Sequence, residues 1–286
     1  MLRIVMDGAG DLPSDWPEKY DIQVIPVNIQ FKDDTYVQGV DLTDEEFYRK
    51  ADELKIVPKT SQPTPQQFID FYKRIAKTGD TILSLHVTSK LSGTFASALI
   101  AARELAGKYH IITLDSATGS AALGFMCKEA RLLERAGVSV QKIVDRMNFI
   151  SKNITVVLTL DTLEYAVRSG RVKALQAAIA SLLSVKPVII LREGMLHMAD
   201  RVRTRQRALT YIIDLAKERV GERLVNIAVV HARAPEVAQN LLERVKQSFN
   251  CYETIITDLS IGVAANLGPG TVGLVVYPVE EGGMHV

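Results

Sequence analysis

The sequence predicts an α/β protein of two domains, an N-terminal parallel Rossmann-like sheet flanked by helices and a C-terminal mixed-sheet α/β domain. The 286 residues are about twice the length of a typical single domain. Hydrophobic residues make up 47% and charged residues 23% of the chain, a composition typical of globular proteins. Through the first half, short β-branched runs alternate with amphipathic stretches, the pattern of a parallel sheet covered by helices.

The first half alternates predicted strands and predicted helices. Strands are expected over 2–6, 23–31, 81–86 and 110–114, and Pro26 places the second of them at an edge or a bulge. Thr43 with Glu46 forms a capping box, and Thr64, Pro65 and Gln67 are a second set of helix-start signals. Further helices are expected over 95–106 and about 120–136. In such sheets ligands gather at the carboxyl ends of the strands.

The second half predicts a mixed sheet. A strand over 154–160 precedes a helix that starts near Asp161 and stops at Gly170, and residues 186–199 form a hairpin around Glu193-Gly194. The remaining expected elements are a helix over 205–219, a strand over 225–231, a helix over 236–247 and strands over 252–259 and 271–279. Ser-Lys-Asn at 151–153 breaks the pattern, so the predicted domains are 1–152 and 153–286.

Composition excludes several classes of function. The 34 basic and 33 acidic residues leave a formal charge of +1, and aromatic residues make up only 6%, so a nucleic-acid partner is not expected. Cys127 and Cys251 are expected to be buried reduced thiols, and the five histidines show no metal-ligand spacing, so no metal is expected. No apolar stretch approaches the roughly 20 residues that span a bilayer, which favours a cytoplasmic location.

Glycine-rich segments do not predict a nucleotide cofactor. GPGTVG (268–273) matches the dinucleotide fingerprint, but a strand follows it where the fingerprint needs a helix, so a turn entering a strand is expected. In MDGAGDLP, Pro13 stands where the third glycine belongs, and GSAALGFM (119–126) lacks the P-loop lysine. No G-x-S-x-G elbow is present.

Small hydroxyl and glycine clusters are expected at strand ends: residues 58–65 precede a helix, residues 88–94 lie between a strand and a helix, and residues 115–121 follow the next strand. Ordinary helix capping explains any one of them. Three at the same end of one parallel sheet also predict an anion site, in which Ser92, Gly93 and Thr94 open a helix and offer free N–H groups.

These clusters belong to eight blocks that make the chain similar to the DegV family of bacterial fatty acid binding proteins over essentially its whole length. In order, the blocks are MDGAGDLP, PKTSQPTPQQF, SKLSGTFASA, DSATGSA, LEYAVRSGRV, LLSVKPVI, RVRTRQRAL and GPGTVGL. The resemblance implies a non-enzymatic carrier that holds one long-chain fatty acid between two domains. It also implies service as the carrier subunit of a fatty acid kinase, which phosphorylates the bound carboxylate to an acyl phosphate for phospholipid synthesis.

The resemblance also implies residue roles. Thr60 and Ser92 match hydroxyls that bind the carboxylate, Gly93 adds its backbone N–H, and Arg171 matches an arginine at the carboxylate mouth that couples to the kinase. Supporting residues are expected at Asp7, Ser61, Thr94, Asp115 and Ser116.

Two departures from the family pattern stand out. Asp7 is followed by Gly8 and Ala9 instead of two hydroxyl residues, and Asn266-Leu267 precedes GPG where the family usually has His-Thr. Asn266 can donate a neutral hydrogen bond to a carboxylate but cannot be protonated as histidine can. Carboxylate binding is therefore expected to persist, while phosphoryl transfer and the kinase partnership stay open.

Other features leave alternatives open. Small residues in AALGFM (121–126), AAIASLL (177–183) and ANLG (265–268) are candidates to line an acyl-chain tunnel or to pack a core. RVRTRQR (201–207) is either a solvated basic face or a docking surface for an acidic partner or, transiently, an anionic membrane. An alternative function is a phosphotransferase or hydrolase acting on a small anionic substrate at the same strand ends, although no nucleophile and base pair is evident.

Overall fold

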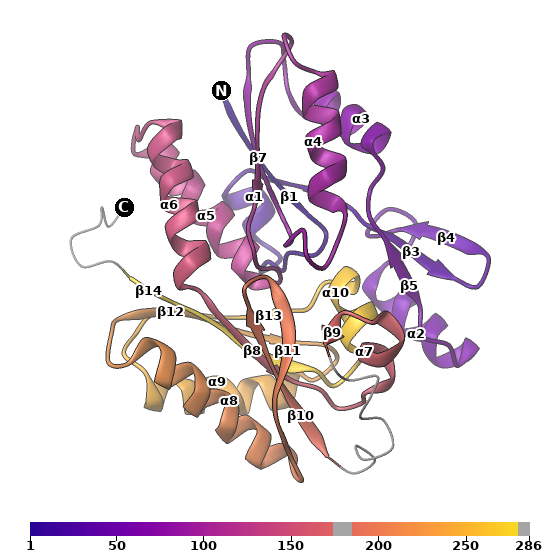
Figure 1. Cartoon of the computed structure of the whole chain (residues 1–286), viewed down its shortest axis with the longest axis vertical. Coiled ribbons are helices and arrows are strands. Elements are labelled where there is room, and N and C mark those ends of the chain that lie inside the picture. The colour runs from indigo at the N-terminus through magenta and orange to yellow at the C-terminus, as the bar shows by residue number, and fades with distance from the viewer. Residues whose placement is uncertain (174–184, 280–286) are drawn as a thin grey trace.

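The computed structural model describes residues 1–173 and 185–279 and shows an α/β architecture (Figure 1). An upper lobe contains a four-stranded sheet, a lower lobe contains a seven-stranded sheet, and a small three-stranded sheet lies to one side. The predicted fold class is confirmed, with one parallel and one mixed sheet.

The four-stranded sheet has the order β2-β1-β6-β7, and all its neighbouring strands are parallel. Its strands are β1 (Leu2–Asp7), β2 (Ile22–Ile25), β6 (Thr81–His86) and β7 (His110–Asp115). The parallel order places the carboxyl ends of these strands at one edge, as predicted.

Helices cover both faces of this sheet, because successive side chains of a strand point to opposite faces. Val5 of β1 packs with α3 (Pro65–Ile75) and α4 (Thr94–Glu104), whereas its neighbour Ile4 belongs to the cluster that contains α5 (Ala121–Arg135). The short α1 (Trp16–Lys19) and α6 (Val140–Asn153) add to the α5 side.

The predicted extended segment over 23–31 is two strands in different sheets, so that expectation is corrected. β2 ends at Ile25, and β3 (Asn28–Phe31) pairs with β4 (Asp34–Val37) and β5 (Lys59–Ser61) in the small sheet. Pro26 lacks an N–H and lies between the two strands, where no ladder bond is needed. The predicted capping box of Thr43 and Glu46 is confirmed at the start of α2 (Asp44–Leu54).

The seven-stranded sheet is mixed, with the order β13-β12-β14-β8-β10-β11-β9. Its strands are β8 (Thr155–Thr159), β9 (Val172–Lys173), β10 (Lys186–Arg192), β11 (Met195–Val202), β12 (Val225–His231), β13 (Cys251–Asp258) and β14 (Val272–Pro278). The hairpin prediction is confirmed, since Glu193 and Gly194 both have positive φ between β10 and β11.

Two long helices, α8 (Arg205–Val220) and α9 (Pro235–Ser248), cover one face of this sheet. The opposite face shares a single buried hydrophobic cluster with the upper lobe, which contains Ile4 of β1 as well as Val275 of β14. The lobes are therefore packed together through a common core. The short helices α7 (Glu164–Ser169) and α10 (Ile261–Leu267) contact each other, and α10 also packs on β5 (Figure 1).

The segment before the predicted domain boundary is helical. α6 runs to Asn153 and β8 starts at Thr155, so the upper sheet lies entirely before residue 152 and the lower sheet entirely after it. The division into 1–152 and 153–286 is compatible with this arrangement and stays a prediction.

The arginines of RVRTRQR do not share one face. Thr204 caps α8 and separates Arg201 and Arg203 from the helical Arg205 and Arg207. Arg205 is half-buried and donates to the carbonyl of Gly270, while the other three arginines are exposed. An extended segment with period two would have put them together, but the helix start rotates the later pair away.

Candidate functional site

A cavity of about 300 Å³ lies where the small sheet, the loop before α4, and α7 and α10 meet. Seven of the residues singled out from the sequence line it, namely Thr60, Ser61, Ser92, Gly93, Thr94, Arg171 and Asn266. They come from four separate stretches of the chain, so the fold brings together what the sequence places far apart.

The loop before α4 supplies one wall of the cavity. Gly93 is the N-cap of α4, and the Ser92 Oγ accepts a hydrogen bond from the Thr94 N–H at 3.3 Å and lies 2.8 Å from the Thr94 Oγ1. The first N–H groups of a helix lack partners within the helix and favour negative charge. Hydroxyl and N–H donors are thus gathered at one wall.

Asn266 lies opposite, on α10, and reaches the small sheet. Its Nδ2 donates to the Gly262 carbonyl at 2.8 Å and contacts the Thr60 Oγ1 at 3.4 Å. The position where the family usually has histidine therefore lies within the cavity, and the side chain there offers a neutral amide.

Arg171 adds a positive charge to the lining. It follows α7, whose C-terminal Gly170 is left-handed with φ of 68°, and its Nη1 donates to the Ser169 carbonyl at 2.6 Å. The Ser169 Oγ also donates to the Asn266 carbonyl at 3.2 Å, which links the Arg171 turn to α10. The guanidinium is the cationic group of the lining.

Three predicted supporting residues, Asp7, Asp115 and Ser116, lie outside the lining. Asp7 is fully buried and accepts from the N–H groups of Ala9 and Val87, both of which line the cavity.

Asp115 and Ser116 hold the neighbouring loops in the same way. The Asp115 carboxylate accepts from the N–H groups of Ser89 and Ala117, and the Ser116 Oγ donates to the Thr118 carbonyl. These polar residues hold the loops around the cavity and do not line it.

A buried polar chain beneath the cavity was not anticipated from the sequence. Tyr72 OH donates to Ser84 Oγ at 2.9 Å, Ser84 Oγ lies 2.9 Å from His86 Nε2, and His86 Nδ1 lies 3.2 Å from the Asp7 carboxylate. Ser84, His86 and Asp7 resemble a nucleophile, base and acid in order. All three have zero exposure, so a substrate does not reach the hydroxyl in this conformation.

Apart from Gln62, the remainder of the described lining is apolar. Its aliphatic side chains are Val27, Val87, Leu91, Leu196, Val263 and Leu267.

Of the predicted tunnel segments, ANLG (265–268) contributes through Asn266 and Leu267, whereas AALGFM (121–126) is buried in the core of α5 and lines no part of this cavity. The segment AAIASLL (177–183) lies outside the described residues.

Several lining residues were missed by sequence reasoning, among them Val27, Val87, Gly262 and Val263 as well as Leu196 and Gln62. Leu196 reaches the cavity from the β10–β11 hairpin, and Gln62 extends from the end of β5. Gln62 lies within the block PKTSQPTPQQF, but nothing in its spacing distinguishes it from a surface glutamine.

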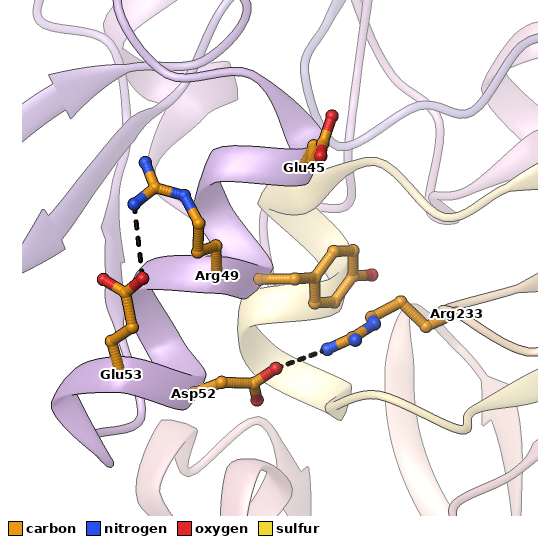
Figure 2. Close-up of a pocket in the computed structure, with 6 residues that line it drawn as sticks. Glu45, Arg49, Asp52, Glu53 and Arg233 are labelled. Atoms are coloured by element: carbon orange, nitrogen blue, oxygen red, sulfur yellow. Dashed lines mark hydrogen bonds and ion pairs between the residues drawn. The ribbon is translucent and has the colours of Figure 1, made fainter.

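A second hollow of about 480 Å³ has a different character. It lies on α2 beside Arg233, and four of its charged side chains form two ion pairs, Arg49 with Glu53 at 3.3 Å and Arg233 with Asp52 at 2.7 Å (Figure 2). The Arg233 guanidinium also lies 5.2 Å from the centre of the Tyr48 ring. With a charged rim, this hollow suits an acyl chain poorly.

The described ranges contain no group of three or more His, Cys, Asp and Glu side chains able to hold a metal ion. Within the same ranges, none of the helices has both the length and the apolar character required to cross a membrane. GPGTVG forms the predicted turn entering a strand, since Gly268 and Gly270 have positive φ and β14 follows.

Known proteins of the same architecture cover nearly the whole chain. A DegV family protein from Thermus thermophilus, whose structure is described as showing fatty acid binding, is 28% identical with a TM-score of 0.88, over 97% of this chain and 99% of that one. DegV from Bacillus subtilis, described as a fatty acid binding protein, is 27% identical with a TM-score of 0.84, with the same coverage.

Sequence comparison agrees with this. The DegV domain-containing protein SA1258 of Staphylococcus aureus is 30% identical over 274 residues, which are 96% of this chain and 97% of the relative. The model of the family described as "Uncharacterised protein, DegV family COG1307" matches residues 1–279, and the chain therefore belongs to the DegV family.

Proposed function

We propose that this protein binds one long-chain fatty acid in the cavity between its lobes, with the carboxylate at Thr60, Ser92, Gly93 and Asn266. The observation that carries the proposal is the composition of the lining, which combines hydroxyl, amide and guanidinium groups with aliphatic side chains. Fatty acid binding by the relatives of Thermus thermophilus and Bacillus subtilis supports it.

Enclosure of the acyl chain supplies the free energy of binding. Removing a methylene from water is worth about 0.8 kcal/mol, so about 14 methylenes contribute on the order of 11 kcal/mol before the costs of association. The cavity volume of about 300 Å³ is at the lower end of the range for small-molecule sites.

The proposal extends to a kinase partner. The carboxylate would lie beside Arg171, which would help to present it to a fatty acid kinase. There a carboxylate oxygen would attack the terminal phosphorus of ATP, giving an acyl phosphate for phospholipid synthesis and ADP. Since Asn266 is neutral, Arg171 is the cation available to the carboxylate in the described lining.

The exposed arginines Arg201 and Arg203 fit a transient contact with an anionic membrane surface during loading, because basic residues attract anionic lipids, and Arg207 is turned away from them by the start of α8. Arg205 is excluded from this surface by its contact with Gly270.

Extraction of the purified protein with organic solvent, followed by mass spectrometry, tests the proposal directly. We expect one fatty acid per chain, or uptake of added palmitate or oleate by protein that lacks it. Thr60→Ala should weaken palmitate binding by roughly tenfold or more, the effect of one hydrogen bond to a charged group. If the protein contains no copurified fatty acid and also takes up neither palmitate nor oleate, the proposed function is refuted.

The phosphotransferase or hydrolase alternative gains no support from the cavity. Among the lining residues that the structure describes, its hydroxyls have no histidine or carboxylate beside them, and the Ser84–His86–Asp7 chain is sealed in the core. We therefore propose a carrier that performs no chemistry itself. Hydrolysis of acyl phosphate by the isolated protein, abolished by Ser92→Ala, would favour the alternative.

A further inference from the structure

Gln62 occupies an unusual place at the mouth of the cavity. It is exposed, it lines the cavity, and its side-chain amide lies flat against the Cα of Gly93. A Cβ built on Gly93 would lie 2.4 Å from the Gln62 Nε2 and 2.7 Å from its Oε1, so the amide fills the space that a side chain at 93 would need.

The backbone of Gln62 is held in place. The Asn28 Nδ2 donates to the Gln62 carbonyl at 3.3 Å, and Pro63 restricts the preceding residue to extended conformations. Asn28 is itself bonded to Gln67 of the α3 capping box at 3.2 Å. The amide therefore projects from a fixed position and not from a free loop.

The side-chain amide of Gln62 has no hydrogen-bond partner among residues 1–173 and 185–279. An amide offers two N–H donors, and this one lies beside Gly93, whose neighbours Ser92 and Thr94 are hydroxyl donors in the same lining. An unpaired donor in this position suits an anionic group entering the mouth.

We propose that Gln62 is a further ligand of the bound carboxylate and that it sets the preference of this site for a carboxylate over a neutral polar head group. This inference rests on the proposed function. Gly93 then has two roles, since it offers its N–H and leaves the space in which the Gln62 amide lies.

The test compares palmitate with hexadecanol, a neutral ligand of the same chain length. Gln62→Ala should weaken palmitate binding by about tenfold, the effect of one charge-assisted hydrogen bond at an exposed site. Gln62→Glu should weaken it by more, about 30-fold to 100-fold, because it places a carboxylate against a carboxylate. Hexadecanol affinity should change less than threefold in both variants.

Gln66→Glu is the matched control. It adds the same charge four residues along the chain, is exposed, bonds to Asp70 and lies outside the lining, so palmitate affinity should stay within twofold of the unmodified protein.

A double-mutant cycle supplies an independent readout. Gly93 has φ of −80°, which alanine adopts without strain, and the atoms that its Cβ would meet are the flexible end of Gln62. Gly93→Ala should therefore displace the amide and weaken palmitate binding about as much as Gln62→Ala, and should add little in the Gln62→Ala background.

The possible failures are distinguishable. Equal losses for palmitate and hexadecanol in Gln62→Glu, or no loss for either, would overturn the role of Gln62 while leaving fatty acid binding intact. If the unmodified protein takes up no palmitate, the proposed function fails and this inference falls with it.

Discussion

Asp11 lies at the joint between the lobes, and its substitution by asparagine gives a quantitative test of the structure. Its carboxylate accepts hydrogen bonds from the Ser120 Oγ and, at 2.8 Å, from the N–H of Ser260, the N-cap of α10. Burial raises the pKa of Asp11 from 3.8 to about 7, although the hydrogen bonds from Ser120 and Ser260 act in the opposite direction; the Asp258 charge adds to the increase.

Proton binding decides whether the stability of the protein rises or falls with pH. Between pH 4 and 7 the folded protein holds a proton on Asp11 that the unfolded chain has released, so the free energy of unfolding falls as pH rises. A difference of about three between the pKa values in the folded and unfolded states corresponds to about 4 kcal/mol in the free energy of unfolding. This contribution is fully present below pH 4 and is lost by about pH 8.

Asp11→Asn removes this dependence. The amide oxygen can accept from the Ser260 N–H and the amide nitrogen can donate to the Ser120 Oγ, so both contacts can persist. We expect the variant to match the unmodified protein within about 1 kcal/mol near pH 5 and to exceed it by up to about 4 kcal/mol at pH 8.

Urea unfolding followed by circular dichroism from pH 5 to 9 measures this difference. Asp15→Asn, at an exposed site in the same segment, is the control and should parallel the unmodified protein. If the free energy of unfolding of Asp11→Asn depends on pH in the same way as that of the unmodified protein, Asp11 is not a buried carboxyl group with a raised pKa.

Three further predictions concern the site and the turn beside it. Ser92→Ala should remove one hydrogen bond to the carboxylate, worth roughly 1.5 to 3 kcal/mol, and unchanged palmitate affinity by titration would contradict the assignment. Asn266→His should make palmitate binding strengthen below about pH 6.5, since a protonated imidazole forms a charge-assisted bond; identical affinities at pH 5.5 and 8 would argue against contact with the carboxylate. Gly270→Ala should lower the free energy of unfolding by more than about 1 kcal/mol, because φ is +77° and the new Cβ would lie 2.5 Å from the Asp161 Cβ. Urea unfolding measures this loss, and Gly221→Ala, at a positive φ with open space around it, gives the backbone cost alone as a control.

Regular elements were predictable where the local pattern was long enough to show a period. The capping box at Thr43 was predicted and found, and so was the Glu193-Gly194 hairpin, because both depend on residues close together in the chain. The helix α10 was missed, since seven residues are too few to establish a helical period. The helix α6 was also missed, although Ile143, Met147 and Ile150 repeat at helical spacing on its buried face.

The candidate site shows the same division between local and non-local information. Ser92, Gly93 and Thr94 were identified as a helix start, and they form one wall of the cavity. Asn266 contacts Thr60, which lies 206 positions earlier in the chain, because α10 packs on the small sheet. No local sequence pattern specifies this packing.

By itself the sequence determined the class of fold, the parallel arrangement of the first sheet, the family and seven of the residues that line the cavity. These properties depend on periodicity, capping and short motifs, which act over a few residues. Only the tertiary structure decided that Asp7 lies under the cavity and not in it, that Arg205 pairs inward, and that Gln62 lies on Gly93. Those outcomes depend on burial and on contacts between distant segments, which are set when the two lobes pack around one core.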